Sequence, residues 1–355
     1  MNRKDRRRLK KQGRAGGAPM RPATRRPAGM GVSGMLLRYA GQDRAPPIDK
    51  AALDIIAAQA KAGPVEAAFA KLRRREILEQ EVSTIEHALE ADPNSIALLS
   101  TLAKLHRHLD QPGKALAAYR RIVDIDPGRE DARHMIAALE GAAAAKVPSR
   151  ASDAFVAAEF DGFAESYDKV LVGMLEYRGP EVVHRAVRAV LGDDPPPQDV
   201  IDLGCGTGLN APLFRPLARR LDGVDLSSKM IEKARGRALY DDLAVGEIVF
   251  HLLATARRYT LALAADVLIY FGDLGPVFRA VHGALGQGGL FVFTVEAGEG
   301  EPYRLTPSGR YAHDDAYVRA VAQAAGFAVD RVTDETLRKE RLAPVMSRCY
   351  VLRRT

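Results

Sequence analysis

Residues 200–225 constrain the fold of this chain more than any other stretch. A hydrophobic strand leads into a turn with glycine at alternate positions, Gly204, Gly206 and Gly208, and a second strand ends at Asp225. Without Cβ atoms on the turn, backbone N–H groups can come close to a ligand. Asp225 follows Gly204 by 21 residues, the spacing at which nucleotide-binding α/β units place a carboxylate on a ribose diol. The pattern predicts a nucleoside site on a parallel sheet.

The spacing of the glycines indicates which nucleoside. A dinucleotide site has G-x-G-x-x-G, whereas this chain has G-x-G-x-G preceded by Asp202. This stretch resembles motif I of the class I S-adenosylmethionine (SAM) methyltransferases. The residues from Asp225 through Ser227 and Met230 to Ala234 resemble the same family's D-x-S-x-x-M-x-x-x-A. Two linked motifs in register predict a SAM-dependent methyltransferase in residues 155–355.

The resemblance implies roles for individual residues in SAM binding. The three glycines would lie under the methionine and ribose, with Asp202 bracing the turn or reaching the cofactor's ammonium group. Asp225 would accept both ribose hydroxyls, Met230 would cover an adenine face, and Glu247 would accept the adenine amino group. In a segment that resembles the family's N-terminal helix, Tyr167 would lie near the methionine and Arg178 would pair with its carboxylate. Plain core packing and an exposed ion pair are the alternatives for these last two residues.

After Asp225 the chain alternates helical and strand patterns, which predicts a doubly wound, Rossmann-like α/β sheet. Such sheets bind ligands outside the carboxyl ends of their strands. We therefore expect acceptor contacts from Asp266, Tyr270, Glu296 and a long binding loop at 297–314. Tyr270 or His313 would serve as base for a hydroxyl or amine acceptor, or would only pack. Methyl transfer needs no protein nucleophile, because positioning lowers much of the barrier. Cys205, with no histidine nearby in sequence, is expected to be structural.

Helical periodicity dominates residues 49–146, where Pro93 and Pro127 stand 34 residues apart in matching contexts. Over residues 80–140 this all-α module resembles tetratricopeptide (TPR) repeats, with residues 81–90 as the second helix of an earlier repeat. TPR arrays bind protein partners on a concave face. The alternative is a helical cap that packs on the catalytic domain.

The net charge of +7 arises in the tail, residues 1–45. The first thirty residues hold eleven Lys or Arg and one acid, and this Gly- and Pro-rich composition predicts disorder. Contact with nucleic acid or an anionic membrane, or a role as a transit peptide, are the alternatives. Two cysteines, no signal peptide and no membrane span predict a cytoplasmic protein. The pattern of its histidines, including His106 and His108, predicts no metal site.

The sequence as a whole predicts SAM-dependent methylation of a small-molecule or protein acceptor by in-line displacement. An adaptor whose methyltransferase fold binds SAM without turnover is one alternative. A nucleic-acid methyltransferase guided by the tail is the other. The segment 265–270 lacks the proline pair that base-amine methyltransferases carry after the fourth strand, which disfavours nucleic acid.

Overall fold

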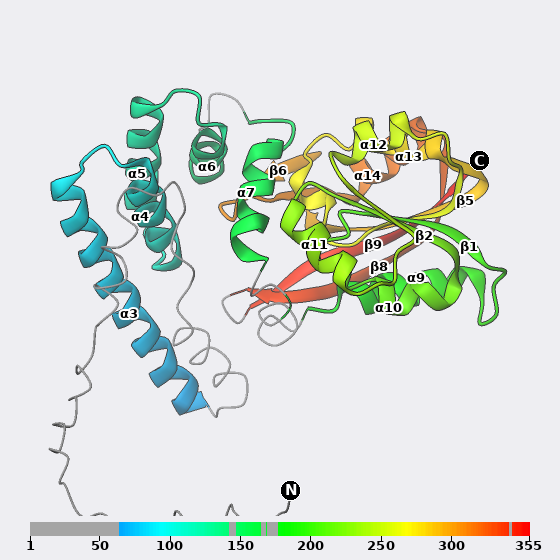
Figure 1. Cartoon of the computed structure of the whole chain (residues 1–355), viewed down its shortest axis with the longest axis horizontal. Helices are drawn as coiled ribbons and strands as arrows, with labels where there is room; N and C mark the ends of the chain where they lie inside the picture. The colour runs from blue at the N-terminus through cyan, green and yellow to red at the C-terminus, as the bar shows by residue number, and fades with distance from the viewer. Residues whose placement is uncertain (1–63, 142–146, 165–167, 169–176, 341–342) are drawn as a thin grey trace, which may run out of the picture. The chain divides into compact units, whose positions relative to one another are not determined.

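The computed structural model describes residues 64–141, 147–164, 168, 177–340 and 343–355. Within these residues a helical N-terminal segment precedes an α/β domain with a Rossmann-like sheet, which confirms the predicted α/β class (Figure 1). The tail at residues 1–45 and the side chain of Tyr167 lie outside the described residues. The expectations for both stay predictions.

Five parallel strands form the part of the sheet that the sequence predicted. Their order is β3-β2-β1-β4-β5, with β1 paired to β2 and β4 on either side. The chain therefore reverses its direction of winding at β1, and the carboxyl ends of β1 and β4 flank the point of reversal. The strands are β1 Gln198–Leu203, β2 Ala218–Asp225, β3 Asp242–Val245, β4 Tyr259–Ala264 and β5 Leu285–Gly298.

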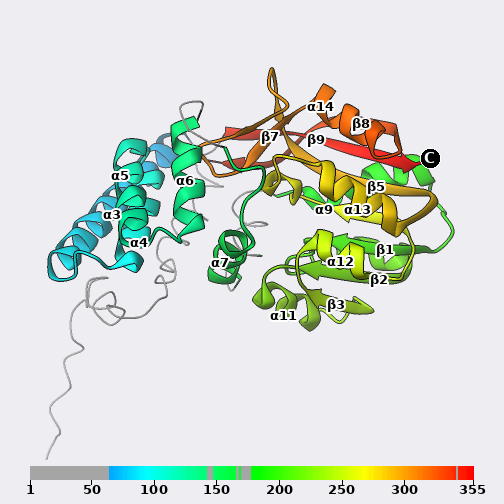
Figure 2. The same ribbon diagram turned by 90° about the horizontal axis from the view of Figure 1, so that it is seen from above.

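Antiparallel strands extend the sheet beyond β5. Strand β9, Ala343–Arg354, pairs antiparallel with both β5 and β8, Phe327–Glu340. Seen from above, β3 and β8 lie toward opposite sides of the sheet (Figure 2). The expected loop at 297–314 is in part a hairpin of β6, Tyr303–Leu305, and β7, Tyr311–Asp314. Because β7 also pairs with the end of β5 and buries Tyr311, this segment extends the sheet instead of forming one long loop.

Successive side chains of the central strands enter two different cores, as the two-residue period of a strand requires. On one face Val200 of β1 and Leu261 of β4 pack against α9, Gly179–Leu191, and Phe214 of α10, Ala211–Phe214. On the other face Ile201 and Ala262 pack in a core with α12, Ile248–Ala254, α13, Gly275–Ala284, and α14, Asp315–Ala324. Figure 1 shows α9 and α10 below the sheet and α12, α13 and α14 above it. Helices therefore cover both faces of the parallel strands.

The N-terminal segment consists of α3 Pro64–Ala91, α4 Ile96–His108, α5 Pro112–Ile125 and α6 Glu130–Glu140. Residues 81–90, expected as a separate helix of a degraded repeat, are the last part of the 28-residue α3. Leu99 and Ala103 of α4 and Tyr119 of α5 are buried. The helices are present, and their assignment as a TPR module stays a prediction.

Two hydrogen bonds join these helices to the turn between β6 and β7. Arg107 donates to the carbonyl of Ser308 at 2.9 Å, and a ring nitrogen of His134 lies 2.8 Å from the carbonyl oxygen of Gly309. Gly309 has φ of +85°, and a Cβ there would lie 2.9 Å from the sulfur of Met135 in α6. These contacts agree with a packing role for the helices, which was one of the two expectations.

Phe278 of α13 is central to the larger core. It is fully buried and makes edge contacts with Phe291, Phe293 and Phe327. We expect Phe278→Ala to lower the free energy of unfolding by about 3–5 kcal/mol, because the lost apolar contacts leave a cavity. Phe250→Ala on α12 is the control, since Phe250 is 72% exposed and its loss should cost less than about 0.5 kcal/mol. Urea titration of both variants checks this, and equal losses would contradict the assignment of the core.

Candidate active site

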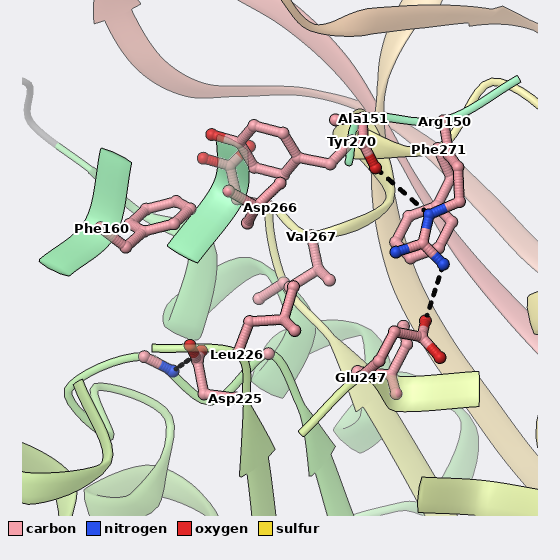
Figure 3. Close-up of a pocket in the computed structure, with 15 residues that line it drawn as sticks. Arg150, Ala151, Phe160, Asp225, Leu226, Glu247, Asp266, Val267, Tyr270 and Phe271 are labelled. Carbon is pink, nitrogen blue, oxygen red and sulfur yellow. Dashed lines mark hydrogen bonds and ion pairs between the residues drawn. The ribbon is translucent and has the colours of Figure 1, made fainter. Parts of the chain in front are cut away.

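A pocket that is partly open to solvent lies at the carboxyl ends of β1, β2 and β4. Its walls come from the glycine turn after β1, the ends of β2, β3 and β4, and α7, Asp153–Phe163 (Figure 3). The lining residues are Arg150, Ala151, Val156, Phe160, Gly204, Gly206, Asp225, Leu226, Glu247, Ile248, Ala265, Asp266, Val267, Tyr270 and Phe271.

The glycine turn is held against the end of β2. The backbone N–H groups of Gly204 and Cys205 both donate to the carbonyl of Val224, at 2.8 and 3.0 Å. Gly204, Gly206 and Gly208 all have positive φ, the left-handed region that other residues rarely adopt. A Cβ on Gly204 would also lie 2.5 Å from a methyl carbon of Val267. Glycine at 204 is therefore required by both conformation and space.

Asp225 connects this turn to the helix that follows β2. One of its carboxylate oxygens accepts the N–H of Gly206 at 2.8 Å, and the other accepts the N–H of Ser227 at 2.9 Å. Burial raises the pKa of Asp225, and the two backbone donors partly offset this shift. Each oxygen keeps a lone pair, and the residue lines the pocket. Ser227 caps α11, Ser228–Gly236, by accepting the N–H of Met230.

Asp202 lies fully buried in β1 beneath the turn, and it does not line the pocket. Asn210 donates to one of its oxygens at 2.8 Å, and the hydroxyl of Tyr240 donates to the other at 2.7 Å. Desolvation raises the pKa of Asp202 to about 6, against the lowering effect of these two donors. Of the two expectations for Asp202, its position agrees with bracing the turn.

Glu247 follows β3 and is the N-cap of α12. Its side chain accepts the N–H of Phe250 at 2.9 Å and forms an ion pair with Arg150 at 3.2 Å. Arg150 also lies over the ring of Phe271 and pairs with Asp153. No local sequence pattern points to Arg150, because 97 residues separate it from Glu247. Glu247 thus lines the pocket with its carboxylate already held in place.

Besides Asp202, three predicted SAM-binding residues lie outside the described pocket lining. Met230 is fully buried in α11. Arg178 is exposed at the N-cap of α9, where its backbone N–H donates to the carbonyl of Leu337. Gly208 packs against Tyr240 and Arg237. Instead, Leu226 and Ile248, which the sequence analysis did not single out, supply apolar walls directly after Asp225 and Glu247. Their position one residue after each acidic residue was the signal that would have found them.

The end of β4 supplies the wall that Asp266 and Tyr270 share. Tyr270 makes an edge contact with Phe160 of α7, with ring centroids 5.7 Å apart. Burial raises the pKa of the Tyr270 phenol, while the positive charge of Arg310 acts in the opposite direction. Glu296 lies next to this wall, buried in β5, and pairs with Arg338.

His313 and Cys205 lie outside the described lining. His313 is fully buried in β7, and a ring nitrogen lies 3.2 Å from the carbonyl oxygen of Gly272. Burial lowers the pKa of His313 to about 4, so the ring is neutral near pH 7. Burial also raises the pKa of the Cys205 thiol, which disfavours a reactive thiolate.

Residues 174–331 match the model of a family described as "Methyltransferase domain". A malonyl-[acyl-carrier protein] O-methyltransferase from Yersinia pestis is 30% identical over 142 residues, covering 40% of this chain and 50% of that protein. Methyltransferase-like protein 27 from Homo sapiens is 34% identical over 87 residues, covering 24% of this chain and 35% of that protein. The chain thus spans half or less of the length of these curated relatives.

Among solved structures, magnesium protoporphyrin IX methyltransferase from Synechocystis PCC 6803 with bound SAM aligns with a TM-score of 0.44. It shares 17% sequence identity and covers 60% of this chain and 100% of that chain. The family match places a SAM-dependent methyltransferase domain in this chain, with SAM as its cofactor. This confirms the class that the paired motifs predicted. Among the described residues, none of the helices combines the length and the apolar character needed to cross a membrane.

The raised pKa of Asp202 predicts a pH-dependent stability. Below its ordinary value of 3.8 the carboxyl is neutral both folded and unfolded, and its neutral form suits the buried site. As the pH rises through about 6, the folded protein must ionise a buried acid, so this contribution is lost. A pKa shift of this size changes the free energy of unfolding by on the order of 3 kcal/mol.

We therefore expect Asp202→Asn to become more stable relative to the wild type as the pH rises. The difference between their free energies of unfolding should shift in favour of the variant by about 3 kcal/mol between pH 4 and pH 7. Urea titrations of both proteins at each pH measure this difference. A difference that does not change with pH would contradict the burial of an ionising Asp202.

Proposed function

We propose that this protein transfers the methyl group of SAM to a nucleophilic atom of an acceptor bound in the pocket beside Tyr270. The observation that carries the proposal is the arrangement at the pocket floor: a turn without Cβ atoms, Asp225 beside it, and Glu247 at the end of the next strand. Together these features match the size and polarity of a nucleoside.

The residues present fit SAM in charge as well as in shape. Among the described lining residues Arg150 is positive, whereas Asp225, Glu247 and Asp266 are negative. SAM carries a sulfonium, an ammonium and a carboxylate, and so has a net positive charge. Acidic walls of low exposure attract such a ligand.

In this proposal Asp225 accepts the ribose hydroxyls through its remaining lone pairs, and Gly204 and Gly206 let the ligand approach the backbone. Leu226 and Ile248 flank the adenine, and the carboxylate of Glu247 meets its amino group. When bound, SAM supplies the electrophilic methyl group. The protein's contribution is to align the acceptor atom and to exclude water, which α7 supports by covering the pocket with Val156 and Phe160.

The acceptor is a small molecule or a group carried by a protein. The malonyl-[acyl-carrier protein] O-methyltransferase that matches this chain supports an acceptor outside nucleic acid. A partner protein on the helices α3 to α6 rests on the proposed TPR assignment, and their contacts with the β6–β7 turn favour packing.

The affinity for SAM tests the proposal. We expect Asp225→Ala to weaken SAM binding tenfold or more, because hydrogen bonds to a charged group are worth about 1.5–3 kcal/mol. Isothermal titration calorimetry with SAM measures the dissociation constant. Asp242→Asn is the matched control, since Asp242 lies on the neighbouring β3, is exposed and does not line the pocket. Unchanged affinity in Asp225→Ala would remove the ribose assignment.

A further inference from the structure

The pocket wall formed after β4 carries polar groups on the side away from Asp225 and Glu247 (Figure 3). Asp266 has φ of +60°, an uncommon conformation for a residue with a side chain. Its backbone N–H donates to the hydroxyl of Thr294 at 2.9 Å, and Thr294 is fully buried. The backbone of Asp266 is therefore held in a strained conformation that fixes its carboxylate beside Tyr270. Such outliers concentrate at functional sites.

A buried ion-pair network supports this wall from behind. Arg338, which is 3% exposed, contacts one carboxylate oxygen of Asp266 and also pairs with Glu296 and Glu340. Arg310 pairs with Glu340 and lies 3.7 Å from Glu296. Both guanidinium groups are thus matched by carboxylates. Neither is left to bind an anion in the pocket.

Two hydrogen-bonding positions remain on the pocket side. In the part of the chain that the structure describes, the second carboxylate oxygen of Asp266, Oδ2, has no hydrogen-bond partner. Among the described residues the Tyr270 hydroxyl donates to no acceptor, so its proton is available to a ligand. One position therefore accepts a hydrogen bond and the other donates one.

These groups discriminate between kinds of acceptor. A carboxylate acceptor would face Asp266 in a pocket whose described lining carries three negative charges and one positive charge, Arg150. Arg150 is itself paired with Glu247 and Asp153. A hydroxyl or amine, in contrast, brings a proton that Asp266 can accept and a lone pair that Tyr270 can orient.

We propose that the acceptor atom is a hydroxyl oxygen or an amine nitrogen, with Asp266 as its proton acceptor and Tyr270 as its orienting donor. This inference rests on the proposed function and names the acceptor class. It goes against a carboxylate acceptor such as a malonyl group carries. The acceptor's lone pair forms the new bond to the methyl carbon, and the methyl–sulfur bond breaks with its electron pair left on sulfur. The proton of the acceptor passes to Asp266 and then to solvent.

The chemical stability of the product tests the acceptor class directly. The full chain is incubated with SAM labelled in its methyl group and an extract of the source cells, and the labelled products are treated with mild alkali. Methyl esters release volatile labelled methanol, whereas ethers and N-methyl groups keep the label. We expect the enzyme-dependent label to stay non-volatile. Release as methanol would overturn this inference and leave methyl transfer intact, and an absence of transfer would overturn both.

Variants separate proton transfer from support of the structure. We expect Asp266→Asn to lower the rate of label transfer at saturating SAM at least 100-fold, the range typical of lost general-base catalysis. Glu299→Gln is the control, because Glu299 follows the end of β5, is exposed and does not line the pocket. Its rate should fall less than about threefold. An equal loss in the two variants, or a full rate in Asp266→Asn, would contradict the role of Asp266.

The pH profile adds a readout that a purely structural role would not change. With Asp266→Asn, we expect the deficit to shrink as the pH rises, since solvent base then removes the acceptor's proton. The ionisable groups around position 266 are the same in the wild type and the variant, so their own titration does not account for a difference between the two pH profiles. They are Arg310, Arg338, Glu296, Glu340 and Tyr270. A deficit that stays constant with pH would mean that Asp266 only supports the wall.

Discussion

The site depends on the hydrogen bonds between the carboxylate of Asp225 and the backbone of Gly206 and Ser227. They join the turn after β1 to the start of α11 and therefore fix the floor of the pocket with respect to both strands. The same carboxylate faces the pocket, so one residue sets the geometry of the turn and offers lone pairs to a ligand. Asp202 supports the turn from below through Asn210 and Tyr240. The side chains of Asp202, Asn210 and Tyr240 are thus engaged in hydrogen bonds that support the turn.

Local sequence patterns were sufficient for the central sheet and its turn. The glycine spacing, the acidic residue ending β2 and the cap at Ser227 all act within a few residues of chain, where backbone conformation is decided. The placement of Met230 shows the limit of this reasoning. Met230 was expected over the adenine; it is fully buried and lies outside the described pocket lining, where Leu226 takes a position on the wall, so its contact with adenine stays a prediction.

Contacts between distant segments could not be predicted from one sequence. Arg150 reaches Glu247 across 97 residues, and Arg338 reaches Asp266 across 72. Each pair depends on how the strands are ordered, and β9, inserted between β5 and β8, determines that order on one side of the sheet. The segment at 297–314 was expected as a loop from its length. Its hairpin is instead stabilised by pairing with β5 and by the buried rings of Tyr311 and His313.

The ion-pair network behind Asp266 is an unusual use of buried charge. Removing several ionised groups from water is costly, and apolar side chains of similar volume often stabilise a fold as well or better. Here the network lies beside the pocket and fixes the two polar groups of its wall, which gives the charges a functional reason. The contacts of α4 and α6 with the turn before Arg310 connect the helical segment to this region.

A crystal structure of the protein with S-adenosylhomocysteine tests the central claim most directly. The account predicts that the ribose diol lies within hydrogen-bond distance of Asp225, with the base between Leu226 and Ile248 and the sulfur directed toward Tyr270. A nucleoside bound elsewhere, or a ribose with no contact to Asp225, would contradict the account.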